Sequence, residues 1–579
     1  MTQHRNAIEV YRNWVAQTYL PSDLKAEIES IAGNEEEIES RFGLDLDFGT
    51  GGLRGVMGAG LNRMNIYTVR RATRALAEHV KTKGSEWVEK GVAIGYDCRH
   101  NSQLFAKIAG GTLAGAGVKA YVSPVLCPTP ELSWAVRHLK AAAGIMITAS
   151  HNPPEYNGFK AYNEHGGQIL EDDALDIRTR MLAIENVFEI PSLTEEEAVA
   201  SGLFISTPID VRLSYLEEVV RRVRNDGIDD AGRRSVHVVY TPLHGTGLVP
   251  VEETLARAGY ANVHVVPEQA QPDGDFSTVK SPNPEESEAL EMGIAAAKVR
   301  GADLVMGTDP DADRVGIAVR TKDDDFRLLT GNQVGALLVD YFVTLRKNSG
   351  SNNAAMVFKT IVTSDFGADI AKRAGFAVED TLTGFKYIGD RITAYEQTGE
   401  YELLVGYEES YGYLVSPIVR DKDAVQTCLA ICEMVAYHKG QGKTLVDRLE
   451  ELYAEFGYHA EKLLSVGLSG LDGVERMHRA LDGLRRQPVS VPGLELEYVE
   501  DYLTGKRQFA QADGPEERLT LPKSDVQKFV FAGGHWAAVR PSGTEPKMKV
   551  YAAATGRDAE ECENVLERIV QAVEARIRV

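Results

Sequence analysis

The feature of this sequence that most constrains its fold is the alternation of short apolar runs and helical patterns in the first 150 residues. The apolar runs at 92–96, 120–124 and 141–147 are typical of buried strands, and helical patterns separate them. Strands that alternate with helices favour a parallel α/β sheet. Open sheets of this kind bind ligands at the carboxyl ends of their strands, so we expect chemistry in the loops that follow these runs.

The loop after the third run has the sequence TASHNP and contains Ser150, which is expected to be exposed at the end of its strand. Pro153, Pro154 and the Asn-Gly pair at 157–158 indicate that the strand ends in a loop and does not continue as a helix. Taken alone, such a pattern is more often an ordinary turn in which the serine hydrogen-bonds nearby backbone. Lys160 either folds back over the same loop or lies in solvent.

The charge of the chain limits the kinds of ligand that it can bind. It has 63 basic and 85 acidic residues, a net charge of −22, which disfavours binding to nucleic acid or to an anionic membrane. An anionic substrate would require a site that concentrates Arg and Lys against this overall field. The sequence shows neither a signal-peptide core nor an apolar run near the roughly 18 residues of a membrane span. Its five cysteines are scattered, so we expect a cytoplasmic protein without a disulfide framework.

A second loop, of sequence DPDADR, begins at Asp309 between two strand-like runs. Asp309, Asp311 and Asp313 alternate along it, so their oxygens can converge on one hard cation such as Mg²⁺. A calcium-binding EF-hand is excluded, because Arg314 and Arg320 stand where that motif needs glycine and a bidentate glutamate. A solvated acidic turn is the alternative. Three protein ligands would leave the open position that a catalytic metal needs.

A glycine-rich loop, FGTGGLRG, contains Thr50 and Arg54. Its glycines allow a ligand to approach the backbone closely, with a guanidinium beside it. It does not match the dinucleotide pattern, because Arg54 takes the place of the third glycine. A flexible surface turn explains the same composition.

The loop GYEESYG places Glu408 and Ser410 between glycines, where their side chains suit hydrogen bonds to neighbouring hydroxyls of a sugar. A plain turn has the same composition. The cluster RDKD that follows contains Lys422, which is either a phosphate ligand or proton donor, or part of a solvent-facing charge cluster.

The loop RPSGTEPK lies between two strand-like runs near the C-terminus. Arg540, Ser542, Gly543 and Thr544 make it a concave, donor-rich loop that suits a phosphate group. An ordinary hairpin turn would not need the arginine, so we predict an anion-binding site.

Changes in patterning divide the chain into four predicted domains: 1–207 with the serine loop, 208–325 with the aspartate loop, 326–457 with the EES loop and 458–579 with the RPSGTEPK loop. The N-terminal residues show two helical patterns, at 10–19 and 24–39, which we interpret as a structural cap. The last domain is expected to have an acidic, loop-rich middle at 497–517 and a terminal amphipathic helix at 558–577.

The order of the TASHNP, DxDxDR, EES and RxSGT motifs resembles the α-D-phosphohexomutase family, and the resemblance covers almost the whole chain. It implies an α/β protein of four domains around a central cleft. Three would be similar α/β domains with mixed or parallel sheets, and the C-terminal one a TATA-binding-protein-like α+β domain. This agrees with the four segments that patterning indicates.

The resemblance also implies a role for individual residues. Ser150 would carry a phosphoryl group, and one Mg²⁺ per chain would be held by Ser150, Asp309, Asp311 and Asp313. The other expected catalytic residues are Arg54, His151, Lys160 and Lys422, without an assignment of the general acid and base. The residues expected to bind substrate are Thr50, Arg314, Thr383, Gly384, Glu408, Ser410, Arg540, Ser542, Gly543 and Thr544.

The reaction implied by the family is the transfer of phosphate between two positions of a sugar through a bisphosphate intermediate. The EES loop resembles that of the phosphoglucomutases, for which glucose 1,6-bisphosphate is the intermediate and activator. Gly51 replaces a common serine and resembles a branch that includes phosphopentomutases. Phosphopentomutase or phosphomannomutase activity by the same mechanism is therefore the alternative. The expected partner is a small sugar phosphate, and the expected state is a monomer or a weak homodimer.

Two other classes of protein compete with this interpretation. A serine phosphatase also uses a metal and a phosphoserine, but it has no use for a second phosphate loop and a separate hydroxyl-binding loop. A catalytically silent sugar-phosphate sensor would be expected to lack the serine or a metal-binding aspartate. All four of these residues are present here.

Overall fold

The computed structural model describes residues 5–468, 473–510, 514–541 and 547–578. The chain forms two compact units. The first unit consists of residues 1–331, 353–355 and 385–444, and the second of residues 332–352, 356–384 and 445–579. The third predicted domain, 326–457, is therefore divided between them.

The first sheet of unit one carries the serine loop at the end of a central strand. Its strands are β1 (Gly52–Val56), β2 (Val92–Tyr96), β3 (Ala120–Val122), β4 (Ala143–Ile147), β5 (Tyr156–Tyr162) and β6 (Phe204–Ser206). They are arranged in the order β1-β5-β4-β2-β3-β6. The strands β2, β3, β4 and β6 pair in parallel, as predicted. However, β5 pairs antiparallel with β4, because the chain returns directly from the serine loop into β5, and β1 pairs antiparallel with β5.

Both faces of this sheet are buried. Ile94 and Ile145 belong to a core on one face, and Ala93 and Met146 to a core on the other. Helices α4 and α6 pack together over the first face, and α7 packs against β2 and β4 on the other. The helices that accompany this sheet are α4 (Ile66–Thr82), α5 (Ser85–Lys90), α6 (Ser102–Gly115), α7 (Thr129–Leu139), α8 (Glu171–Ala183), η1 (Val187–Glu189) and α9 (Glu195–Ala200).

The N-terminal cap consists of α1 (Ala7–Val15), α2 (Ser22–Ser30) and α3 (Glu35–Phe42). The sequence patterns predicted two helices here. The second pattern is interrupted by Gly33, which has a φ of +81°, and Asn34 caps the new helix by accepting from the Glu37 backbone amide. Trp14 and Phe42 fill the core of the cap.

The second sheet of unit one has the order β11-β10-β9-β7-β8. Its elements are α10 (Ile209–Val223), α11 (Asp230–Arg234), β7 (Val238–Thr241), α12 (Leu248–Ala258), β8 (Val263–Val265), α13 (Pro267–Ala270), α14 (Ser287–Arg300), β9 (Leu304–Thr308), β10 (Val315–Arg320) and β11 (Phe326–Leu329). β7 pairs in parallel with β8 and β9, whereas β9 and β10 form an antiparallel hairpin. The DPDADR loop is the turn of that hairpin.

Unit one also contains α17 (Phe385–Thr398), β14 (Glu402–Glu408), β15 (Gly412–Leu414) and α18 (Ala424–Lys439). The strands β14 and β15 form an antiparallel hairpin whose turn is the EES loop. Helix α18 packs on α10 and α12 and buries Cys428 and Cys432, two of the five free thiols. Its Glu433 forms a fully buried ion pair with Arg233 at 2.8 Å.

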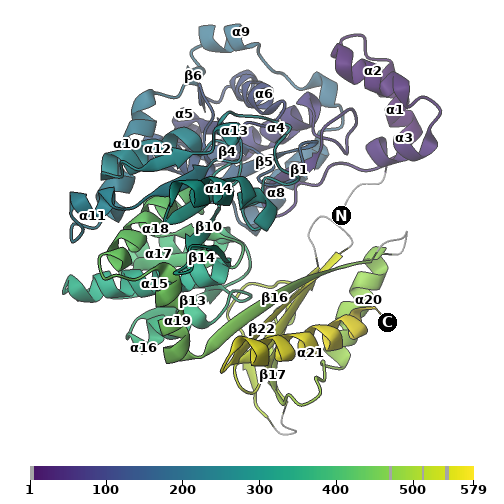
Figure 1. Cartoon of the computed structure of the whole chain (residues 1–579). Coiled ribbons are helices and arrows are strands. Elements are labelled where there is room, and N and C mark those ends of the chain that lie inside the picture. The colour runs from purple at the N-terminus through teal and green to yellow at the C-terminus, as the bar shows by residue number, and fades with distance from the viewer. Residues whose placement is uncertain (1–4, 469–472, 511–513, 542–546, 579) are drawn as a thin grey trace. The chain divides into compact units, whose positions relative to one another are not determined.

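The C-terminal part of unit two is a seven-stranded antiparallel sheet in the order β16-β22-β21-β20-β17-β18-β19. Its strands are β16 (Tyr458–Gly467), β17 (Leu496–Asp501), β18 (Lys506–Phe509), β19 (Glu516–Arg518), β20 (Gln527–Phe531), β21 (His535–Pro541) and β22 (Lys547–Gly556). Helix α21 (Ala559–Ile577) lies along β16 and β22, beside α20 (Gly473–Arg486) (Figure 1). The other elements of this unit are α15 (Gly331–Asn348), β12 (Ala355–Thr360), α16 (Phe366–Arg373), β13 (Ala377–Thr381) and α19 (Leu445–Phe456).

The acidic stretch 497–517 was predicted to be loop-rich, and this expectation misses the strands within it. It contains most of β17, all of β18 and the start of β19. Arg507 pairs with Glu500 at 2.7 Å and with Glu517 at 2.9 Å, so neighbouring strands neutralise one another's charges. No helix in the described part of the chain has the length and apolar content needed to cross a membrane.

The folded state of unit two should become less stable in mild acid because of His459. Its ring stacks on Phe366 with centroids 4.6 Å apart, and burial lowers its pKa to about 4. As the pH falls below about 6.5, the unfolded chain binds a proton that the folded chain excludes, so the free energy of unfolding falls until about pH 4, by about 3 kcal/mol. Urea unfolding of His459→Phe between pH 7 and 4 should show a shallower pH dependence than the parent. His478→Phe, on an exposed part of α20, is the control, and identical slopes for parent and His459→Phe would contradict this prediction.

Candidate active site

The serine loop holds Ser150 in an unusual backbone conformation. Ser150 has a φ of +51°, in the left-handed region, which costs a residue other than glycine roughly 1–3 kcal/mol. Its amide donates to Thr148 Oγ1 at 2.8 Å. The residue is 3% exposed, so the expectation of an exposed serine is wrong in this structure. Instead, the Ser150 hydroxyl donates to Asp309 Oδ2 at 2.6 Å.

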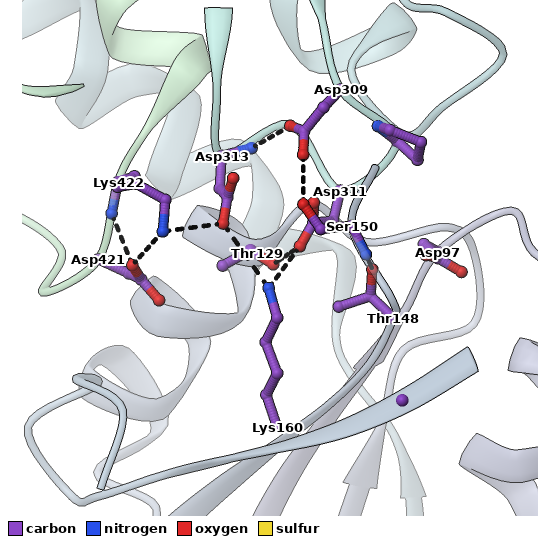
Figure 2. A network of polar contacts seen from close by, with 12 residues as sticks. Asp97, Thr129, Thr148, Ser150, Lys160, Asp309, Asp311, Asp313, Asp421 and Lys422 are labelled. Atoms are coloured by element: carbon purple, nitrogen blue, oxygen red, sulfur yellow. Dashed lines mark hydrogen bonds and ion pairs between the residues drawn. The ribbon is translucent and has the colours of Figure 1, made fainter. Parts of the chain in front are cut away.

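The three aspartates of the DPDADR loop converge, as the sequence predicted. Asp309, Asp311 and Asp313 are at most 2% exposed, and one oxygen from each lies within 4.8 Å of the others (Figure 2). The backbone amides of Asp313 and Arg314 both donate to Asp309 Oδ1. Ala312 has a φ of +51° at the apex of the turn. The solvated acidic turn is therefore excluded as an explanation of this loop.

Two lysines from distant parts of the chain enter the same cluster (Figure 2). Lys160 Nζ, from β5, lies 2.8 Å from Asp311 Oδ2 and 3.6 Å from Asp313 Oδ2. Lys422 Nζ lies 3.1 Å from Asp313 Oδ2. Burial opposes the charge of both lysines, but the carboxylates outweigh it and raise both pKa values. Both side chains are therefore charged at neutral pH, and neither is an ordinary solvated lysine.

The donor set of the aspartate loop fits a divalent cation. Asp311 Oδ1 and Asp313 Oδ1 are buried and accept no hydrogen bond, although the second oxygen of each faces a lysine. Asp313 Oδ1 has the guanidinium of Arg314 nearby, with Nε at 3.8 Å. A buried carboxylate oxygen without a hydrogen bond is costly, and a hard cation that prefers oxygen ligands would satisfy both. The residues that could hold it are Asp309, Asp311 and Asp313, with the oxygen of Ser150 beside them.

The aspartates differ in their electrostatic environment. Burial, followed by the charges of Asp311 and Asp313, raises the pKa of Asp309 well above its ordinary value. Burial also acts on Asp311, but the ion pair with Lys160 outweighs it and lowers the pKa of that carboxyl.

His151 and Arg54 lie at the rim of the serine loop. His151 Nδ1 is 3.3 Å from Ser150 Oγ. Burial, followed by the charges of Arg314 and Arg54, lowers the pKa of His151 well below its ordinary value, so its ring is neutral at pH 7. Arg54 Nη1 donates to Asn152 Oδ1 at 3.0 Å, which connects the glycine-rich loop to the serine loop.

The EES loop is joined to the aspartate loop through backbone contacts. An isolated bridge pairs Arg314 with Gly412, and the amide of Val315 donates to the carbonyl of Tyr411 at 3.1 Å. A Cβ atom on Gly412 would lie 2.0 Å from Cδ of Lys422, so the glycine is what allows the lysine to pass. Glu408 is 5% exposed, at the start of this turn.

The structure also identifies site residues that the sequence interpretation missed. Thr129, at the start of α7, donates its hydroxyl to Asp311 Oδ2 at 2.9 Å and its amide to the carbonyl of Asp311 at 2.8 Å. Asp421 accepts from the hydroxyl of Tyr162 at 2.9 Å and lies beside Lys422. Asp421 lies within the RDKD cluster, but no motif distinguishes Thr129.

A third missed residue, Lys386, donates to the backbone carbonyl of Thr50 at 3.0 Å and to Glu171 at 2.8 Å. It thereby fixes the glycine-rich loop, in which Thr50 itself is exposed. The position of Lys386, two residues after Gly384, was the available signal.

The other predicted substrate residues are not part of this cluster within unit one. Thr383 and Gly384 belong to unit two, where Gly384 has a φ of +119° ahead of α17. Arg540, also of unit two, lies on β21 and donates to the hydroxyl of Tyr551 at 3.0 Å. Ser542, Gly543 and Thr544 lie outside the described residues.

Models of four protein domains match the chain in order. They are phosphoglucomutase/phosphomannomutase α/β/α domains I at 45–188, II at 214–322 and III at 330–456, and the C-terminal domain at 499–572. The chain belongs to the phosphoglucomutase/phosphomannomutase family. The predicted family and fold class are therefore confirmed, and the chain is a phosphotransferase of the mutase type. The four predicted domain boundaries stay predictions.

Relatives of the chain extend this likeness over most of its length. It is 38% identical to a phosphoglucomutase of Staphylococcus haemolyticus, covering 89% of this chain and 91% of that protein. It is 37% identical to a phosphoglucomutase of Staphylococcus epidermidis, covering 90% and 94%.

Solved structures share the fold at lower identity. A phosphoglucomutase/phosphomannomutase family protein from Burkholderia thailandensis aligns with a TM-score of 0.65 at 18% identity, covering 91% of this chain and 97% of its own. Parafusin, a phosphoglucomutase from Paramecium, aligns with a TM-score of 0.63 at 18% identity, covering 92% and 95%.

Removing the Thr129 hydroxyl should weaken divalent-cation binding. In Thr129→Val, Asp311 Oδ2 loses one of its two side-chain donors, so the carboxylate is less firmly oriented toward the cation. We expect the Kd for Mn²⁺, measured by calorimetry, to rise about 10-fold or more. Thr254→Val is the matched control, because that buried hydroxyl has no hydrogen-bond partner. Equal Kd values for Mn²⁺ in Thr129→Val and Thr254→Val would show that Thr129 does not orient the carboxylate of Asp311.

Proposed function

We propose that this protein is a phosphoglucomutase, which interconverts α-D-glucose 1-phosphate and glucose 6-phosphate through a phosphoserine at Ser150 and a glucose 1,6-bisphosphate intermediate. The observation that carries the proposal is the 2.6 Å hydrogen bond from Ser150 to Asp309, inside a buried cluster with unpartnered carboxylate oxygens. A hydroxyl held against three carboxylates that could bind a cation supports the roles of Ser150 as nucleophile and of the aspartates as metal ligands. The relatives named phosphoglucomutase, at 37–38% identity, support the choice of reaction.

The metal site and the serine would act together. Asp309, Asp311, Asp313 and the phosphoserine would hold one Mg²⁺, which neutralises charge on the transferring phosphoryl group. Lys160 and Lys422, charged and held against the same carboxylates, add positive charge on two further sides. This arrangement meets the need of an acidic chain to concentrate cations where an anion binds.

The transfer has two balanced halves. The bond between phosphorus and Ser150 Oγ breaks while a bond forms between phosphorus and the oxygen of a free sugar hydroxyl. The hydroxyl proton passes to a base, and Ser150 Oγ takes up a proton. The resulting bisphosphate turns, and Ser150 Oγ loses its proton as it bonds to the phosphorus of the other phosphate. The bond between that phosphorus and the sugar oxygen breaks, and the sugar oxygen takes up a proton, which regenerates the phosphoserine and releases the isomer.

Other residues would bind the parts of the substrate that do not react. Glu408 and Ser410 would bind sugar hydroxyls in either orientation of the intermediate. Arg54, His151 and Arg314 would surround the transferring phosphoryl group. The residues proposed for the remaining contacts, including the second phosphate, are Thr50, Thr383, Gly384, Arg540, Ser542, Gly543 and Thr544.

The decisive experiment is a coupled assay on glucose, mannose and ribose 1-phosphates with Mg²⁺ and a trace of the matching bisphosphate. We expect the highest kcat/KM with glucose 1-phosphate. A higher kcat/KM with ribose 1-phosphate would instead identify a phosphopentomutase, the activity that Gly51 favours. Release of inorganic phosphate faster than isomerisation would refute the mutase reading in favour of a phosphatase.

Replacing the nucleophile should abolish turnover. Ser150→Ala is expected to lower kcat by at least about 10⁴-fold, since it removes the oxygen that carries the phosphoryl group. Ser214→Ala, which alters a serine that accepts from Trp134, should leave kcat unchanged. Substantial turnover by Ser150→Ala would rule out this serine as the carrier.

Removing the charge of Glu408 should weaken recognition of the sugar. We expect Glu408→Gln to lower kcat/KM about 10- to 100-fold for both monophosphates, because a hydrogen bond to a charged group is lost in each orientation. The Kd for Mn²⁺ should stay unchanged. Glu400→Gln, at an exposed position near the start of β14, is the control. An effect on only one of the two monophosphates would contradict a shared sugar-binding role.

A further inference from the structure

One buried guanidinium binds most of the serine loop. Arg99, 3% exposed, follows β2, and its Nη2 donates to the carbonyl of Ser150 at 2.6 Å and also to that of Asn152. Its Nη1 donates to the carbonyls of Pro153 at 2.8 Å and of Tyr156 at 3.1 Å. Four carbonyls of a seven-residue loop therefore converge on one side chain.

Arg99 is itself fixed from two other sides. Its Nε lies 3.4 Å from Asp97 Oδ2, and Asp97 Oδ1 accepts from the Arg99 amide at 3.0 Å and from Ser102 Oγ at 2.6 Å. The guanidinium lies over the ring of Phe276, 4.9 Å from its centroid. Phe276 comes from the segment between α13 and α14, so the guanidinium contacts residues from two parts of unit one that are far apart in the sequence.

This arrangement explains how Ser150 keeps its left-handed backbone. A carbonyl oxygen cannot donate, so a loop whose carbonyls point inward needs a donor-rich partner at its centre. A planar guanidinium has five donors in a fixed fork, whereas an ammonium group is a single point with three. Only arginine can bind these four carbonyls while keeping its contact with Asp97.

We propose that Arg99 is a positioning residue for phosphoryl transfer: it holds the carbonyls of residues 150–156 so that Ser150 faces the aspartate loop. This inference rests on the proposed mutase function. Arg99 does not contact the reacting atoms and acts through the backbone of the nucleophile. A misplacement of the nucleophile by about 1 Å can lower a rate by about 100-fold, even when binding is intact.

The test compares Arg99→Lys with Arg233→Lys. Arg233 is the matched control, because it is also a fully buried guanidinium that pairs with a carboxylate, Glu433, and donates to backbone carbonyls. Both variants should lower Tm. Arg99→Lys alone should lower kcat about 100-fold, with KM within about 3-fold of the parent, and Arg233→Lys should keep the parent kcat.

A second readout does not depend on activity. Hydrogen–deuterium exchange of the peptide that spans residues 148–156 should rise at least 10-fold in Arg99→Lys and stay unchanged in Arg233→Lys. In Arg99→Ala, methylguanidinium should restore part of kcat and of the exchange protection, and methylammonium should restore neither. An open cavity of about 630 Å³ has Asp97, Cys98 and Arg99 in its lining.

The outcomes separate this inference from the proposed function. A parent protein without mutase activity would overturn the function, and the exchange data would still decide whether Arg99 holds the loop. An active parent with unchanged kcat and exchange in Arg99→Lys would overturn the inference alone. If kcat fell in both arginine variants in proportion to their loss of Tm, Arg99 would have only a structural role. That result would also overturn the inference.

Discussion

The hydrogen bond between Ser150 and Asp309 joins the ends of strands from two sheets of unit one, and the rest of the candidate site is arranged around it. Ser150 follows β4 of the first sheet, and Asp309 opens the β9–β10 turn of the second. Each sheet alone presents an ordinary strand end. Their juxtaposition brings the Ser150 hydroxyl within 2.6 Å of Asp309, in a cluster of three aspartates that could hold a metal ion. Neither half of the site has a catalytic arrangement without the other.

The second constraint on the site is the repulsion between its three buried aspartates. Three aspartates buried within a few ångströms of one another repel strongly in a medium that screens charge poorly. The chain compensates with Lys160 from β5 and Lys422 from the loop before α18, each of which pairs with one oxygen and leaves another available. The two lysines therefore offset part of the negative charge, while Asp311 Oδ1 and Asp313 Oδ1 accept no hydrogen bond. A chain with a net charge of −22 gathers its cations at the place where an anionic substrate is expected.

Much of this site follows from local sequence, because its motifs consist of residues that are close together in the chain. The alternating aspartates of the β9–β10 turn, the turn after β4 and the glycines of the EES loop are short-range features whose geometry depends mainly on local backbone preferences. The predictions for Ser150 and for the three aspartates could therefore be made from residue types and spacing. The prediction for the acidic stretch 497–517 missed its strands because it, too, used only local sequence. Its charges look solvated along the sequence, and only the pairing of β17, β18 and β19 shows that they neutralise one another.

By itself, the sequence determined the α/β class, the family and the motifs that contain Ser150, the three aspartates and the EES loop, for which it predicts the roles of nucleophile, cation ligands and sugar-binding loop. Only the tertiary structure decided how these motifs are oriented and supported. Thr129, Asp421 and Arg99 belong to no catalytic motif, and each acts through a hydrogen bond or ion pair with a residue that packing brings close. Long-range contacts of this kind depend on where whole sheets and helices meet. The burial of Ser150 likewise depends on the aspartate loop of another sheet, which no pattern around the serine encodes.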